Sequence, residues 1–326
     1  MLLITLIGTL LLASASGTVA AQQPRDPLGV GPGPLPPTVR VPPTPNREAI
    51  ERALRKGDWD QAEKLLAAEI DQRPESPELL KFLAGIFLMD RKPLNAAIAI
   101  KKAEQFGALD EATRHALALA YIAMGRRDWA RPELERLEAA SPADSTYQYW
   151  LARLDYDEGL YGRAIGRLER VIAKEPDFMR AHDNLGLCYE AQGDTGRAVA
   201  HYRKAIALNR QAAARSPWPP LNLGILLRSR GEMTESERLL REAVQYDEAL
   251  PQARYELGVL LEQTDHPDDA VEELSRAAAL DPGYPQPHYA LARIHRRQGR
   301  TADAQAALAT FKRLQEKQAQ QPEAVP

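Results

Sequence analysis

A pattern of 34 residues recurs along the chain from residue 43 to residue 318. Eight repeats fit one alignment, and the step between their starts is 34 residues except for one step of 38. The repeats start at residues 43, 77, 111, 145, 179, 217, 251 and 285. A tandem repeat of this period limits the chain to folds in which one small unit stacks on the next.

Each repeat predicts two amphipathic helices separated by a turn. Apolar residues at positions 7, 11, 20, 24 and 27 follow helical spacing on both sides of a break. Position 15 is glycine in six repeats, which favours a left-handed residue at the end of the first helix. Small residues at positions 8 and 20 allow the two helix backbones to approach closely. Four repeats hold a proline at position 32, which closes the second helix: Pro74, Pro142, Pro176 and Pro282.

These columns resemble the tetratricopeptide repeat family. The resemblance rests on the 34-residue period, the leucine followed by Gly or Ala at positions 7 and 8, the small residue at position 20 and the late proline. It covers residues 43 to 318. It implies an all-α fold, a right-handed superhelical α-solenoid of about eight helix–turn–helix repeats, in which the first helices line a concave groove.

The two ends of the array and one step inside it depart from the pattern. Prolines at residues 42, 43 and 45 delay the first helix of repeat one until Asn46, which can serve as its N-cap. Four extra residues near 212–216 predict that the second helix of repeat five runs about one turn longer.

Asp155 occupies position 11 of repeat four, which is a large apolar site in the family. Either Tyr156 takes this place through a small rotation of the helix, or Asp155 pairs with an arginine. We favour the rotation, because a lone buried carboxylate is costly.

The first 21 residues predict a secretory signal. Residues 2–12 are largely apolar, and small residues follow up to Ala21. No Lys or Arg precedes the apolar run, and an uncleaved membrane anchor over residues 2–21 is the alternative. We favour cleavage because several Gly, Ser and Thr residues make a poor span. The expected localisation is therefore exported, periplasmic or secreted, with membrane contact only if the N-terminus stays uncleaved.

Residues 22–45 predict a disordered linker, since nine prolines and three interleaved glycines leave little to bury. A plain spacer is the simpler reading, and a tether or a ligand for a groove is the functional one. The predicted organisation is then a signal at 1–21, a linker at 22–45, a repeat array at 46–318 and a disordered tail at 319–326.

Composition and motifs argue against several classes of function. The 42 Lys+Arg residues nearly balance the 45 Asp+Glu residues, so bulk charge does not favour a nucleic-acid partner. Cys188 is the single cysteine, which excludes an intrachain disulfide and predicts a packed thiol. No His-Glu-x-x-His motif and no glycine-rich phosphate loop occurs. We therefore predict a protein that is not an enzyme and has no metal and no cofactor. The histidines never stand three or four residues apart: His115, His182, His201, His266, His288 and His295.

Function is expected from the surface of the first helices. In the family that the chain resembles, positions 2, 5, 9, 12 and 13 face the groove. In repeats four to eight these positions mix Tyr, Trp and Arg, which contribute strongly to binding at interfaces. Some of the tyrosines can instead pack between neighbouring helices. The predicted partner-binding residues are Tyr149, Arg153, Tyr156, Arg180, Asp183, Trp218, Arg228, Tyr255, Glu262, Tyr289, Arg293, Arg296 and Arg297.

The leading hypothesis is a non-catalytic scaffold that binds a protein or peptide in this groove. Arg293, Arg296 and Arg297 share one helical face and predict an acidic partner, unless Glu262 of the preceding repeat neutralises them. The alternative is an accessory subunit of an envelope assembly or polysaccharide export machine, in which the groove contacts a glycan or a large complex. A repeat-bearing glycosyltransferase is disfavoured, because the array uses nearly all of the chain.

Overall fold

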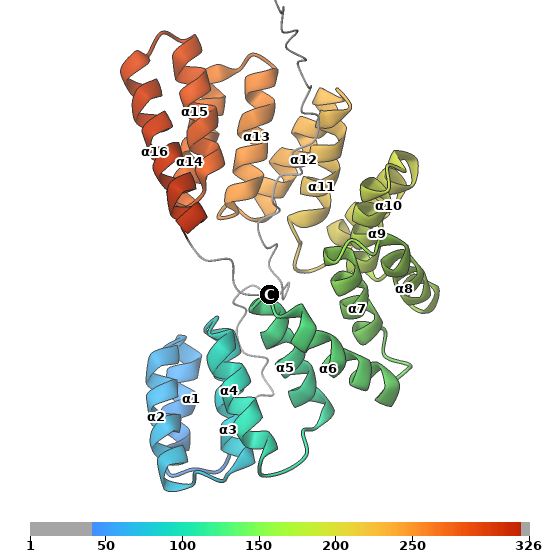
Figure 1. Cartoon of the computed structure of the whole chain (residues 1–326), viewed down its shortest axis with the longest axis vertical. Helices are drawn as coiled ribbons and strands as arrows, with labels where there is room; N and C mark the ends of the chain where they lie inside the picture. Colours follow the sequence, from blue (N-terminus) through green and yellow to red (C-terminus); the bar gives the residue numbers. More distant parts are fainter. Residues whose placement is uncertain (1–40, 321–326) are drawn as a thin grey trace, which may run out of the picture. The chain divides into compact units, whose positions relative to one another are not determined.

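The computed structural model describes residues 41–320, and within them the chain forms α-helices α1 to α16 and no strand (Figure 1). The predicted signal at 1–21, most of the predicted linker and residues 321–326 of the predicted tail lie outside the described residues. Between residues 41 and 320, no helix has both the length and the apolar content that crossing a bilayer requires.

The chain divides into two compact units, of which the first extends to Arg126. Each helix of this unit packs against the next one in sequence. Val41, which the prediction places in the linker, is buried in the core of α1 to α3. The packed part of the chain therefore begins earlier than residue 46, the predicted start. The helices of the first unit are α1 (Arg47–Lys56), α2 (Trp59–Gln72), α3 (Pro77–Met89), α4 (Pro93–Glu104) and α5 (Glu111–Ala123).

The second unit begins at Arg127. Consecutive helices pack against each other, and from α7 onward each first helix also contacts the first helix of the next repeat. The helices are α6 (Arg127–Ala140), α7 (Ser145–Asp157), α8 (Tyr161–Lys174), α9 (Met179–Ala191), α10 (Thr195–Gln211), α11 (Trp218–Ser229), α12 (Met233–Tyr246), α13 (Pro251–Gln263), α14 (Pro267–Leu280), α15 (Pro285–Arg297) and α16 (Thr301–Gln320).

Position 15 of every repeat adopts the left-handed conformation that ends the first helix. Six of these residues are glycines with φ between 69° and 80°. The other two are Arg91, with φ 56°, and Asp265, with φ 62°. The turn therefore keeps its geometry even where a side chain makes it unfavourable.

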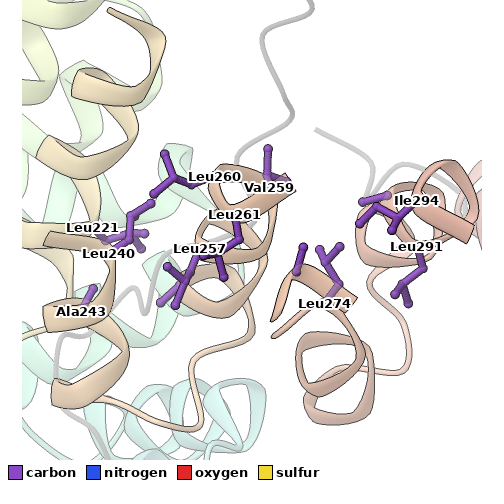
Figure 2. Packing of buried hydrophobic residues seen from close by; sticks show 13 residues of the cluster. Leu221, Leu240, Ala243, Leu257, Val259, Leu260, Leu261, Leu274, Leu291 and Ile294 are labelled. Carbon is purple, nitrogen blue, oxygen red and sulfur yellow. The ribbon is translucent and has the colours of Figure 1, made fainter. Parts of the chain in front are cut away.

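Close packing of the two helices of a repeat explains the small residues at position 8. A Cβ atom on Gly186 would lie 2.5 Å from the ring of Tyr202, and one on Gly258 would lie 2.7 Å from Leu274. Buried apolar residues from each of the helices α11 to α15 form one cluster, shown in Figure 2. The core of the second unit is thus built from contacts between neighbouring helices, one repeat after another.

Two departures from the repeat follow the prediction only in part. Asn46 is the N-cap residue of α1, but its side chain does not cap the helix and instead donates to Glu69 Oε1 at 2.9 Å. Helix α10 has 17 residues, compared with 14 in α8, and it ends at Gln211. The remaining extra residues form a loop, which the buried Asn209 closes by donating to the carbonyl oxygen of Ser216 and accepting from its N–H, each at 2.8 Å.

The favoured account of Asp155 is wrong, because Asp155 is completely buried at position 11 and pairs with arginines. Arg131 of α6 donates to its carboxylate at 2.9 Å, and Arg167 of α8 donates at 3.1 Å. Arg163 lies 3.6 Å away. The carboxylate is therefore not alone, because the helices on both sides of α7 supply guanidinium groups.

Candidate functional site

The predicted binding residues lie on the first helices of the second unit, α7, α9, α11, α13 and α15. Polar side chains on these helices contact the first helix of the next repeat, and we call this set of contacts the first-helix ladder. Its four rungs are Tyr149 and Arg153 with Asn184, Asp183 with Asn222, Arg228 with Glu256, and Glu262 with Arg293 and Arg297.

The first rung joins α7 to α9. Arg153 donates to Asn184 Oδ1 at 3.0 Å, and Asn184 Nδ2 donates to the hydroxyl oxygen of Tyr149 at 3.3 Å. Tyr149 is 6% exposed, and its ring lies 5.3 Å from that of Phe178. Burial raises the pKa of the Tyr149 hydroxyl. This tyrosine therefore packs between helices, and little of its surface is accessible to a partner.

The second rung joins α9 to α11. Asn222 Nδ2 donates to both carboxylate oxygens of Asp183, at 2.9 and 3.1 Å, and both side chains are buried. Arg180 lies one helical turn before Asn184 and is exposed. Trp218, at the start of α11, is half-buried against the apolar cluster of Figure 2.

The third and fourth rungs are ion pairs. Arg228 donates to Glu256 at 2.7 Å, and burial raises the pKa of the Glu256 carboxyl. Glu262 accepts from Arg293 Nε at 2.8 Å and lies 2.9 Å from Arg297 Nη2. The hydrogen bond to Glu262 raises the pKa of the Arg293 guanidinium. Glu262 therefore neutralises part of the arginine cluster that the sequence predicts on α15.

The carboxylates of these two rungs are buried more deeply than their guanidinium partners. The Glu262 side chain is 3% exposed, whereas Arg293 is 41% and Arg297 is 54% exposed. Arg296 is also exposed, and within residues 41–320 no hydrogen bond or ion pair of its side chain is found. On α15, solvent therefore meets the guanidinium groups of Arg293, Arg296 and Arg297, whereas the carboxylate of Glu262 is buried.

The aromatic residues of the predicted site differ in exposure. Tyr156 is half-buried, and its ring lies 5.5 Å from that of Tyr161. Tyr255 is half-buried too, with a T-shaped contact to Tyr284 at 5.4 Å. Tyr289 is 50% exposed, which makes it the most accessible tyrosine of the predicted set.

Sequence analysis missed a pair of histidines on α9 and α10. His182 Nδ1 lies 3.2 Å from His201 Nδ1, and His182 Nε2 lies 2.9 Å from the carbonyl oxygen of Pro176. A carbonyl can only accept, so His182 Nε2 is the donor in its contact with Pro176. The two residues are 19 apart in sequence, and only the pairing of the two helices within a repeat brings them together.

Two features bear on metal binding and on nucleophilic chemistry. Asp60, Glu63 and Asp90 bring carboxylate oxygens within 4.8 Å of one another. The Lys92 ammonium already binds them, at 3.3, 2.9 and 2.6 Å, and these contacts raise its pKa. Cys188 is completely buried, and burial raises the pKa of its thiol to about 12. A thiol with such a pKa is a poor nucleophile at neutral pH.

Two models of the same protein family together match most of the chain. The tetratricopeptide repeat model matches residues 48–111, 115–166, 151–214 and 221–285, and a second tetratricopeptide repeat model matches residues 265–324. Cellulose synthase operon protein C of Escherichia coli (strain K12) is 31% identical over 87 residues, which are 27% of this chain. The match spans only 7% of that much longer relative.

Two solved structures share the fold. The APC/C hetero-tetramer Cut9-Hcn1 matches with a TM-score of 0.63 and 15% identity, over 75% of this chain and 48% of that chain. Yeast Tom70 matches with a TM-score of 0.63 and 14% identity, over 91% of this chain and 70% of that chain. Both structures place the chain among helical repeat solenoids.

Proposed function

Because the chain belongs to the tetratricopeptide repeat family, whose fold supports protein–protein interaction, we propose that it is a non-catalytic scaffold. The proposed partner is an acidic segment of a protein, bound along the first helices of the second unit. The proposed contact residues are Arg153, Arg180, Arg228, Tyr255 and Arg293.

The observation that carries this proposal is the unequal exposure of the charges. The buried carboxylate of Glu262 holds the exposed guanidinium groups of Arg293 and Arg297 in place. The guanidinium groups keep N–H donors toward solvent, and five donors per arginine leave some available for a second carboxylate. Half-buried Trp218 and Tyr255 add apolar surface on the same set of first helices. An acidic ligand would therefore find both charge complementarity and aromatic anchors.

The experiment is a titration of the full chain into a fluorescein-labelled peptide of ten glutamates, followed by fluorescence anisotropy. Arg180→Glu should weaken binding about tenfold or more, because it replaces an exposed cation by an anion. Arg170→Glu is the matched control, with the same charge change at an exposed position of α8. Binding should also weaken between 50 and 300 mM salt, as roughly expected when the Debye length shrinks.

Arg293 and Arg297 are poorer choices for this test. Replacing both would leave the buried Glu262 without partners, and the loss of stability would be confused with a loss of binding. Equal affinity of the wild type, Arg180→Glu and Arg170→Glu would contradict the proposed site on the first helices.

A second candidate function is an accessory role in polysaccharide export. It is favoured by the 87-residue match to cellulose synthase operon protein C. In this case the aromatic side chains would stack on sugar rings. Cosedimentation with insoluble cellulose, compared between the wild type and Tyr289→Ser, separates the two candidates. Retention that depends on Tyr289, without any affinity for the glutamate peptide, would favour the polysaccharide role.

We also propose that the protein is exported and that residues 22–40 form a spacer after cleavage, since Val41 is already part of the core. The support is the apolar run of residues 2–12 followed by small residues up to Ala21. Expression of the full chain in a bacterium and N-terminal sequencing of the protein from the periplasm test this. A first residue of Gln22 supports export with cleavage, whereas an intact Met1 in the membrane fraction supports the anchor.

A further inference from the structure

Two positions that are buried in the core of the other repeats are partly exposed to solvent in repeat eight. Position 24 is completely buried in the first seven repeats, but Leu308 in repeat eight is 37% exposed. Position 20 is also completely buried in seven repeats, and Ala304 in repeat eight is partly exposed. The seven buried residues at position 24 are Leu66, Ile100, Leu134, Leu168, Tyr202, Leu240 and Leu274.

In the other repeats of the second unit, the first helix of the following repeat supplies this cover. Helix α12 packs against α13, and α14 packs against α15. Leu240 lies in one cluster with Leu257 of the following first helix, and Leu274 lies in it with Leu291 (Figure 2). A residue at position 24 is therefore placed to receive a helix from the next repeat.

Three apolar side chains remain uncovered on α15 and α16. Tyr289 is 50% exposed, Leu308 is 37% exposed and Phe311 is partly exposed. The rings of Tyr289 and Phe311 lie 5.1 Å apart, so the side chains adjoin one another. We call these three residues, together with Arg296, the terminal face; Arg296 lies about two turns after Tyr289 on the same face of α15.

The role of Arg296 on this face can be inferred from the equivalent residues of the first-helix ladder. Position 12 of each of the two preceding repeats pairs with the next first helix: Arg228 with Glu256, and Glu262 with Arg293. Arg296 holds the same position in repeat eight and is exposed, with no hydrogen-bond partner found within residues 41–320. By this register, a helix on the terminal face would place an acidic residue opposite Arg296.

We propose that the terminal face binds one amphipathic helix of a partner protein, which takes the place of a ninth first helix. Its apolar side covers Leu308, Phe311 and Tyr289, and an acidic residue pairs with Arg296. A second copy of the same face is a poor occupant, because exposed arginines would then oppose each other across a shared symmetry axis. This surface is separate from the proposed site around Arg180, and it does not depend on that function.

The test uses a labelled synthetic peptide with the sequence of residues 250–264 of this chain. In the intact protein this segment forms α13, covers position 24 of repeat six and carries Glu256 opposite Arg228. The full chain should raise the anisotropy of the peptide. Leu308→Asp should remove the binding, since it places a charge in the centre of the apolar contact.

The matched control is Leu160→Asp, because Leu160 is 38% exposed and Leu308 is 37% exposed. Leu160 is the N-cap residue of α8, where aspartate is favoured, so this variant should fold and bind the peptide like the wild type. Circular dichroism should give the same helicity for the wild type and both variants.

A charge swap tests the predicted register. A peptide with Glu256→Lys should bind the wild-type chain about fivefold more weakly, and Arg296→Glu in the chain should restore its affinity. Arg180→Glu should leave peptide binding unchanged. The helix peptide and the glutamate peptide therefore report on the two sites separately, and either proposal can fail alone.

Three results would overturn the inference. The first is a wild-type chain that does not bind the peptide at all. The second is binding that survives Leu308→Asp with unchanged affinity, which would place the peptide elsewhere. The third is a concentration-dependent dimer in sedimentation velocity that Leu308→Asp converts to monomer, because a second copy would then be the occupant of the terminal face.

Discussion

Asp155 has the most deeply buried carboxylate in the described part of the second unit, and it forms ion pairs with residues of the neighbouring helices. Arg131 and Arg167 reach it from α6 and α8, and both guanidinium groups are themselves largely buried. Arg131 also bonds Glu158 at 2.9 Å, and Arg167 bonds Glu138 at 2.9 Å. One buried acid thus links three helices at a position that is apolar or aromatic in every other repeat except repeat eight, where it is His295.

Replacing this carboxylate should be costly. We expect Asp155→Asn to lower the free energy of unfolding by roughly 3 kcal/mol, because two largely buried cations lose their shared anion. Urea unfolding followed by circular dichroism measures the change. Asp157→Asn removes an exposed carboxylate two residues away and should cost less than about 1 kcal/mol. Equal stability of the two variants would show that the arginines do not need Asp155.

The choice of Asp155's partner could not be predicted from the sequence. Periodicity assigns position 11 to the buried face, and burying an unpaired carboxylate is unfavourable. The sequence alone therefore favours a rotation of the helix that removes the carboxylate from the core. The arginines that pair with the carboxylate lie 24 residues before and 12 residues after Asp155. Which side chains meet across neighbouring helices depends on rotamers, and the repeat pattern does not specify rotamers.

At the scale of helices, α8, α9 and α10 meet around the histidine pair. His201 stacks on Tyr189 of α9 and on His182, with ring centroids 5.4 and 5.5 Å apart. Glu169 of α8 accepts from the Tyr189 hydroxyl at 3.0 Å, and Arg197 of α10 lies over the Tyr189 ring. The contact between the three helices therefore contains groups that titrate.

This contact should make stability depend on pH. Burial first, and then neighbouring His182 and Arg197, lower the pKa of His201 below its ordinary value of 6.5, although Glu169 opposes the shift. The unfolded chain then binds a proton at a higher pH than the folded chain does. Stability should therefore fall as the pH drops below 6.5.

The measurement is the free energy of unfolding by urea between pH 7.5 and pH 5, for the wild type and for His201→Gln. For the variant, the free energy of unfolding should decrease less over this pH range, because glutamine does not titrate. His266→Gln is the control, because His266 is exposed at the N-cap of α14, away from the pair, and this variant should keep the wild-type profile. Identical pH profiles for the wild type and His201→Gln would contradict the prediction.

The helices themselves follow from the sequence much better than these contacts do. The first helices α3, α5, α7, α9, α13 and α15 begin at the residues where the repeat begins, since Gly or its substitute at position 15 and proline at position 32 mark the turns. Tyr149 shows the limit for the candidate site. Its position predicts a surface residue, but Phe178 and Asn184 enclose it, which only the packing of α9 on α7 determines.

At the scale of the whole molecule, contacts within the second unit are made between neighbours. Each helix touches the helices before and after it, and first helices also touch the first helix of the next repeat. No contact between more distant helices of this unit is found within residues 127–320. In such an array, stability is close to a sum of repeats and their interfaces, so damage can remain local.

Hydrogen exchange of Asp155→Asn should show this locality. We expect faster amide exchange in α6, α7 and α8, which share the Asp155 contacts, and a smaller increase in α9, which packs on α8. Protection in α13 to α15 should stay at the wild-type level, because no direct contact joins them to α7 or α8. Mass spectrometry of peptic fragments resolves these helices, and Asp157→Asn serves as the control with wild-type exchange throughout. A uniform increase from α6 to α16 would instead mean that the second unit opens as one cooperative block, with interfaces between repeats stronger than the repeats themselves.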